Sequence, residues 1–258
     1  MSDFKSNPFY MSVSGDYALF TDPMTKGGGE KFSYQVPTYQ ALKGLIEACY
    51  WKPTLYFVVD EVKVLKEIRT ETKGILSMMK NGSKDLNYCT YLKDVEYLVK
   101  FHFRWNDNRP ELAHDRNEKK HEQILLRSME RGGRRDVFLG TRECVGHIAR
   151  IKERDYETKE SFYDGKTLSM GIMFHSFGYP DESYNEEQKD ILVSHFCSIV
   201  MENGVIRFKE PKDCEIRHEL GGYSIKAFGQ GNFSAVDQEI LEYERMGVPV
   251  HELTDCSS

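Results

Sequence analysis

Residues 117 to 123, NEKKHEQ, bring two lysines and a histidine together at the predicted start of a helix. Histidine transfers protons near neutral pH, and a lysine ammonium stabilises negative charge. The helix dipole disfavours cations in a first turn by roughly 0.3 to 1 kcal/mol each, whereas a bound phosphate would reverse that effect. The segment therefore indicates either a phosphate site or a solvated charged face, on which Asp115 and Glu118 act as a capping pair.

A helical projection of residues 116–131 sorts these side chains by face. At about 100° per residue, one stripe of cations forms, and it contains Arg116, Lys120, Arg127 and Arg131. The core side is predicted to hold Leu125, Leu126 and Met129, with His121 at the border. The charge continues past Gly132 and Gly133, which end the helix, into Arg134 and Arg135. Each of these arginines, and Lys119, either grips phosphate or lies on a solvated face.

RNA is the anion for which such a set suffices without a metal ion, because the ribose 2′-hydroxyl beside the scissile phosphate can be the nucleophile. The protein must take that proton, stabilise the phosphorane and protonate the leaving 5′-oxygen. A histidine, a lysine and a tyrosine could share these tasks. The chain has 15 tyrosines, and the residue pattern alone does not select one.

The strands and helices that position this segment are predicted from the periodicity of apolar residues and from the positions of proline and glycine. A first strand is predicted over 9–20, a glycine-tipped loop over 21–34, and a helix over 37–51 that Pro53 ends. Further β structure is predicted over 54–70, over 87–105 as two strands joined at Lys93 and Asp94, and over 134–151. Lys26 and Lys31 flank the glycines of the loop, which either closes over RNA or is a plain mobile loop.

The order β-α-β-β-α-β is that of a ferredoxin-like, RNA-recognition-like α+β fold, with two helices on one face of an antiparallel sheet. The chain is predicted to divide into residues 1–155, which carry the candidate site, and a smaller antiparallel β-rich part, residues 156–258. Asn203 and Gly204 mark a hairpin turn in the second part.

Charge and composition limit the kinds of partner and cellular location that fit the chain. The net charge is -6, but residues 1–150 hold 24 Lys and Arg against 20 Asp and Glu, whereas residues 151–258 hold 11 against 21. A polyanion is therefore expected on the first part. No stretch is long and apolar enough for a membrane span or a signal peptide, which predicts a cytoplasmic protein with no membrane partner. The six scattered cysteines have no zinc-site spacing and are expected to be reduced thiols.

Three segments together carry a family resemblance: LIEACYWKP at 45–53, NEKKHEQ at 117–123 and FLGTREC at 138–144. Their combination resembles the d subtype of the Cas-five family, the repeat-processing endoribonucleases of type I-C CRISPR systems in the RAMP superfamily. The resemblance spans most of the first 150 residues. It implies Tyr50, Lys120 and His121 as the catalytic residues, with no cofactor and no metal, and leaves open whether Tyr50 or His121 is the base.

The resemblance also implies the substrate and partners. The expected activity is cleavage of CRISPR precursor RNA at the repeat hairpin, with a 5′-hydroxyl and a 2′,3′-cyclic phosphate as products. The protein is then expected to stay on the 5′ handle of the guide RNA, beside the other subunits of the type I-C surveillance complex. A monomer is expected in isolation, and binding of duplex DNA is left open. The alternatives are a non-catalytic subunit that caps the 5′ handle and a general duplex-binding module.

Overall fold

The structure is a computed structural model that describes residues 4–23, 25, 30–78, 82–183, 189–223 and 245. Within these residues no helix has the length and hydropathy that a membrane span requires. Lys26 and the glycines at 27–29 lie outside the described residues. The strands are β1 (Phe9–Ala18), β2 (Lys31–Phe32), β3 (Leu55–Val64), β4 (Thr70–Met78), β5 (Lys84–Trp105), β6 (His147–Arg150), β7 (Thr167–Gly178), β8 (Ile191–Glu202), β9 (Val205–Arg207) and β10 (Ile216–Gly222). The α-helices are α1 (Tyr39–Cys49), α2 (Glu118–Glu130) and α3 (Glu153–Thr158).

The described strands form one sheet around a ferredoxin-like centre. The order β3-β5-β1-β6 is antiparallel throughout, and α1 and α2 contribute to the same core on one face of it. Beyond β3 the sheet continues through β9 and β8 to β10, and β7 pairs with β8. The predicted fold class is therefore confirmed. The division at residue 155 stays a prediction; β9, from the second part, pairs with β3 from the first.

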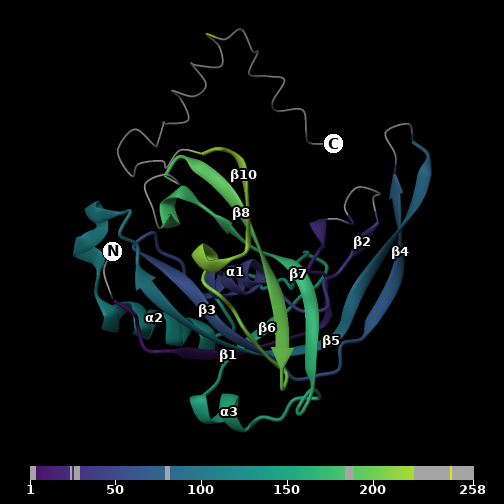
Figure 1. The fold of residues 1–258 in the computed structure, drawn as a ribbon, viewed down its shortest axis with the longest axis horizontal. Helices are drawn as coiled ribbons and strands as arrows, with labels where there is room; N and C mark the ends of the chain where they lie inside the picture. Colours follow the sequence, from purple (N-terminus) through teal and green to yellow (C-terminus); the bar gives the residue numbers. More distant parts are fainter. Residues whose placement is uncertain are drawn as a thin grey trace. The chain divides into compact units, whose positions relative to one another are not determined.

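Strand β5 differs from its prediction. It is one strand of 22 residues, not two strands joined at Lys93 and Asp94. Asp94 does adopt a positive φ of 52°, but the ladder with β1 continues on both sides of it, and its carboxylate accepts hydrogen bonds from Lys66 and Arg69. The first part of β5 pairs with β4, and these two strands extend as an arm on the right of Figure 1.

The two faces of β5 are both covered near its carboxyl end. Phe101 and Phe103 are fully buried against the helices, so they are core residues. On the other face His102 is 1% exposed, and Leu98 packs against Tyr156 of α3. Helix α3, an element that the sequence did not predict, therefore covers part of the reverse face.

The segment 134–151 is mostly a loop. Only β6, at its end, is a strand, although Phe138 and Val145 form an isolated bridge. Gly140 has a φ of 100°, and a Cβ there would lie 2.0 Å from the carbonyl oxygen of Leu19. The chain thus passes close to Leu19, just after β1, and its backbone at Gly140 has a left-handed conformation that a regular strand does not contain. The hairpin turn at Asn203 and Gly204 is confirmed, because both residues have positive φ between β8 and β9.

Candidate active site

Helix α1 places Tyr50 at its carboxyl end. The Thr38 hydroxyl accepts a hydrogen bond from the amide of Ala41 and begins the helix, as Thr at an N-cap does. Tyr50 is the C-cap residue and has an extended backbone, with φ −156° and ψ 127°, while its amide still bonds to the carbonyl of Ile46. Its ring turns inward and is 2% exposed.

Helix α2 places His121 against Tyr50. The Asn117 side chain caps the helix by accepting a hydrogen bond from the amide of Lys120. The predicted capping pair of Asp115 and Glu118 is therefore wrong, because Asp115 ends a short 3-10 helix, Pro110–Asp115, before α2 begins. The Ser128 hydroxyl donates to the carbonyl of Cys49, which joins the two helices near the site.

The hydrogen bonds of His121 define its tautomer. Its Nε2 lies 2.8 Å from the main-chain carbonyl oxygen of Asp115, and its Nδ1 lies 2.8 Å from the Tyr50 hydroxyl oxygen. A carbonyl oxygen only accepts, so Nε2 carries the proton. In the neutral ring Nδ1 is then an acceptor, and the Tyr50 O–H donates to it. The imidazole is thus oriented to receive a proton through Tyr50.

Burial keeps this pair neutral. It lowers the pKa of His121, and the carbonyl and carboxylate of Asp115 offset only part of that effect. Burial also raises the pKa of Tyr50; the Asp115 carboxylate acts in the same direction, and Arg134 opposes it. A neutral phenol that donates to a neutral imidazole can pass its own proton to the ring while its oxygen takes up another, so that the pair gains one proton and one positive charge.

Lys120 lies beside the pair and is paired with Asp115. Its ammonium forms an ion pair with Oδ1 of Asp115, while the Thr54 hydroxyl donates to Oδ2 of the same carboxylate at 2.8 Å. The hydrogen bond from Lys120 is the largest of the causes that lower the pKa of Asp115. The Lys120 side chain is 46% exposed. The lysine is therefore the member of the trio that solvent, or a phosphate, reaches directly.

The Tyr50–His121 pair, by contrast, is covered. His121 is 0% exposed, and the Trp105 ring stands edge-on to it at a centroid distance of 5.6 Å. Phe103 contributes a second edge contact. The side chains around the pair must shift before RNA touches either residue.

The predicted RNA-binding cations have different surroundings. The Arg134 guanidinium carbon lies 6.0 Å from the centre of the Tyr50 ring, and its amide bonds to the carbonyl of Ala48. Arg116 precedes α2 and is half-buried, where it donates to the carbonyl of Asn106, so the predicted stripe is shorter than expected. The other described candidates are exposed: Lys31, Lys119, Arg127, Arg131 and Arg135.

Three residues of the site were missed as functional candidates in the sequence. Asp115 was predicted only as a capping residue. Its position five residues before Lys120 was the one signal in the sequence for a contact with that lysine. Thr54 follows Pro53, which was used only to predict where the preceding helix ends. Nothing in the sequence indicated a role of the Thr54 side chain. Trp105 ends the predicted β segment 87–105, and a strand position alone does not indicate contact with a histidine.

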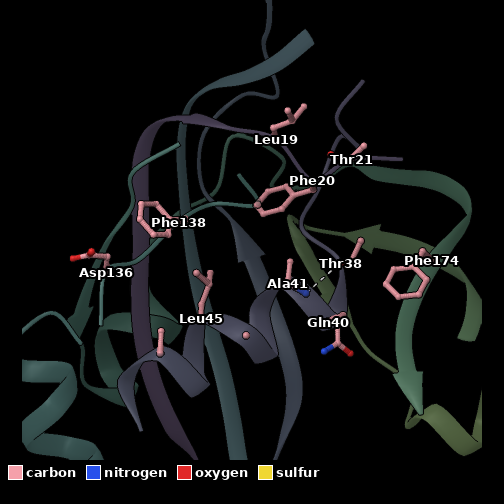
Figure 2. Close-up of a pocket in the computed structure, with 13 residues that line it drawn as sticks. Leu19, Phe20, Thr21, Thr38, Gln40, Ala41, Leu45, Asp136, Phe138 and Phe174 are labelled. Carbon is pink, nitrogen blue, oxygen red and sulfur yellow. Dashed lines mark hydrogen bonds between the residues drawn. The ribbon is translucent and has the colours of Figure 1, made fainter. Parts of the chain in front are cut away.

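A pocket of about 460 Å³ lies along the outer side of α1. Figure 2 shows Ala41 and Leu45 of α1 between Phe138 on one side and Phe174 of β7 on the other. Ala48, two residues before Tyr50, also lines it. The same helix thus contributes to this pocket and to the Tyr50 cluster. Within the described residues, no group of three or more His, Cys, Asp or Glu side chains is arranged to hold a metal ion.

The antiparallel β3-β5-β1-β6 sheet, with two helices on one face and a polar cluster where they meet, defines a RAMP-like ferredoxin fold. A model of the family described as CRISPR-associated protein (Cas_Cas5) matches residues 10–209. The chain therefore belongs to the Cas5d family, as the resemblance implied.

Individual relatives agree with this membership. A Thermus thermophilus protein is 33% identical over 227 residues, which cover 84% of each chain. A Mannheimia succiniciproducens protein is 28% identical over 229 residues, which cover 78% of this chain and 94% of that one. Both are named CRISPR pre-crRNA endoribonuclease Cas5d. The crystal structure of a Streptococcus mutans protein described as functionally uncharacterized is 49% identical, with a TM-score of 0.70, and covers 83% of this chain and 98% of that one.

Proposed function

We propose that this protein is a metal-independent endoribonuclease that cleaves CRISPR precursor RNA at the repeat hairpin. The observation that carries the proposal is the hydrogen bond from Tyr50 to Nδ1 of His121, with Lys120 as the next residue in the chain. The names of the two endoribonuclease relatives support the substrate class. The trio has the chemical types that cleavage by the RNA's own 2′-hydroxyl requires.

In the proposed reaction the 2′-oxygen attacks the adjacent phosphorus. The P–O2′ bond forms, the P–O5′ bond breaks, and the products are a 2′,3′-cyclic phosphate and a 5′-hydroxyl. One proton leaves the 2′-hydroxyl for the Tyr50–His121 pair, and one returns from the pair to the departing 5′-oxygen, so the pair ends as it began. The Lys120 ammonium stabilises the added negative charge of the phosphorane. Because Nδ1 of His121 already accepts the hydrogen bond from the Tyr50 hydroxyl, His121 is the better proton acceptor of the two.

The cationic surface around α2 completes the proposal. Arg134 lies nearest the pair, and the exposed Lys119, Arg127, Arg131 and Arg135 extend positive charge from it. These side chains would neutralise phosphates of the RNA backbone. The cleaved RNA stays bound by its 5′ handle, and the protein then serves as a subunit of a type I-C surveillance complex. We divide the protein into residues 1–155, which carry the site, and the β-rich residues 156–258.

A second candidate is a non-catalytic subunit that caps the guide RNA. The burial of Tyr50 and His121 favours it, since a covered pair cannot reach RNA without rearrangement. The ion pair between Lys120 and Asp115 points the same way, because a paired ammonium offers less charge to a phosphate.

One experiment separates the two candidates. Purified protein is incubated in EDTA with repeat RNA and with the same RNA carrying a 2′-deoxyribose at the cleavage nucleotide. The endoribonuclease cuts the first and leaves the second intact, whereas a capping subunit binds both and cuts neither. His121→Ala and Lys120→Ala should each lose cleavage and keep most of the RNA affinity. Two variants that cut at the wild-type rate would show that the site is assigned wrongly.

A further inference from the structure

Asp115 contacts two of the three predicted catalytic residues, Lys120 and His121, and also Thr54. It stands at the end of the 3-10 helix, Pro110–Asp115, two residues before Asn117, which caps α2. From there its main chain reaches His121 and its carboxylate reaches Lys120 and Thr54. The main-chain carbonyl acts on His121, and the carboxylate acts mainly on Lys120.

The main-chain carbonyl acts on the imidazole. It accepts a hydrogen bond from Nε2–H, with 2.8 Å between nitrogen and oxygen, which leaves Nδ1 unprotonated toward Tyr50. If the carbonyl were displaced, the ring could adopt the other tautomer, with a proton on Nδ1 and no acceptor for Tyr50. The hydrogen bond from Thr54, the residue before β3, anchors the residue that carries this carbonyl.

The carboxylate acts on the lysine. It binds the Lys120 ammonium through Oδ1, and Oδ2 lies 3.7 Å from Nε2 of His121. A lysine side chain has four rotatable bonds and would otherwise sample many positions in solvent. The carboxylate therefore holds the ammonium beside the imidazole, but its own negative charge also repels an approaching phosphate.

We propose that Asp115 is a positioning residue of the cleavage site, which sets the His121 tautomer and holds Lys120 in place at the expense of RNA affinity. This inference rests on the proposed endoribonuclease function. It assigns Asp115 no contact with the reacting atoms, and it makes Thr54 the anchor of Asp115.

The charge of Asp115 adds a signature that a merely structural residue would lack. Its carboxylate raises the pKa of Tyr50 and, against the larger effect of burial, also raises that of His121. Neutralising the carboxylate removes both effects. Both limbs of the pH–rate profile should then move toward lower pH, and the variant should still fold as the wild type does.

The test compares Asp115→Asn, Thr54→Val and a matched control, Asp60→Asn. Asp60 is also an aspartate between a buried histidine and a lysine: its Oδ2 lies 2.8 Å from Nδ1 of His102, and Lys5 lies 3.5 Å from its Oδ1. Single-turnover cleavage of repeat RNA is measured from pH 5 to 9, together with the RNA concentration at half-maximal rate. Thermal unfolding of each variant is recorded first.

Asp115→Asn should lower the maximal rate at least about tenfold, with an unchanged or lower half-maximal RNA concentration and a profile moved toward acid. Thr54→Val should lower the rate without moving the profile, because the charge remains. Asp60→Asn should change neither. A wild-type rate in Asp115→Asn, or an unmoved profile, would overturn the inference. Should Asp115→Asn not fold, a wild-type rate in Thr54→Val would overturn it instead.

Failure of the proposed function gives a different result. In that case the wild-type protein does not cut repeat RNA at all. The tautomer can then still be read from the ¹⁵N shifts of His121 in the RNA-free protein. A proton on Nε2 in the wild type, and a mixture of tautomers in Thr54→Val, support the positioning role without any cleavage assay. A proton on Nδ1 in the wild type refutes it.

Discussion

Tyr50→Phe is the substitution that tests the site most directly, since it removes one oxygen and keeps a ring that is 2% exposed. The lost hydroxyl leaves Nδ1 of His121 buried without its partner, which costs roughly 1–3 kcal/mol of stability. For a chain of this size that corresponds to a fall in Tm of about 2–4 °C for each kcal/mol. Loss of a proton-transfer group should also slow cleavage by about 10² to 10⁴-fold.

The matched control is Tyr10→Phe on the other face of the sheet. The Tyr10 hydroxyl donates to Glu153 at 2.6 Å and its ring is 8% exposed, so the same atom is lost from a similar setting. Both variants should lose a few degrees of Tm and bind repeat RNA as the wild type does, but only Tyr50→Phe should stop cutting in a single-turnover assay. Equal cleavage rates in the two variants would refute the proton-transfer role of Tyr50.

Three further outcomes are expected. Arg134→Gln should weaken RNA binding and reduce the slope of log affinity against log salt by about 0.7 to 0.9 if the arginine contacts one phosphate; an unchanged slope would return it to the solvated face. Burial lowers the pKa of His175 to about 4, so the unfolded state binds more protons and stability falls as the pH drops from about 6.5 toward 4, by up to roughly 3 kcal/mol. Urea midpoints across that range should show the fall, and His175→Gln should flatten it. Gly140→Ala should lower stability by about 1–3 kcal/mol, because its φ of 100° is strained for alanine and its Cβ meets the Leu19 carbonyl, whereas Gly44→Ala, with nothing within 4 Å, should not lower the Tm.

Local signals in the sequence were sufficient for the elements with strong periodicity. Thr38 and the apolar spacing that follows predicted α1, and Asn203 with Gly204 predicted the β8–β9 turn. Helix α2 was predicted in the right place with its core side correct at Leu125 and Met129. In each case the contacts that decide the structure lie within one turn or one helix. Residues close together in the sequence are therefore enough to predict it.

Long-range packing decided the remaining features. A turn at Asp94 was a reasonable reading of local residues, but pairing with β1, β3 and β4 keeps β5 continuous. Helix α3, whose Tyr156 packs against Leu98 of β5, was likewise not predicted. The convergence of Tyr50 with His121 joins residues 71 positions apart, and only the family resemblance selected this tyrosine from fifteen.

The uninterrupted course of β5 limits how this chain can change in length. Its 22 residues span roughly 70 Å at about 3.3 Å each, from the arm to Trp105, whose ring lies against His121. Because side chains alternate between faces, one residue inserted between Leu92 and Trp105 would turn that indole away from the histidine. Residues added to the β4–β5 arm would leave the indole in place. Related chains can therefore diverge in arm length while the last part of β5 keeps a fixed residue count.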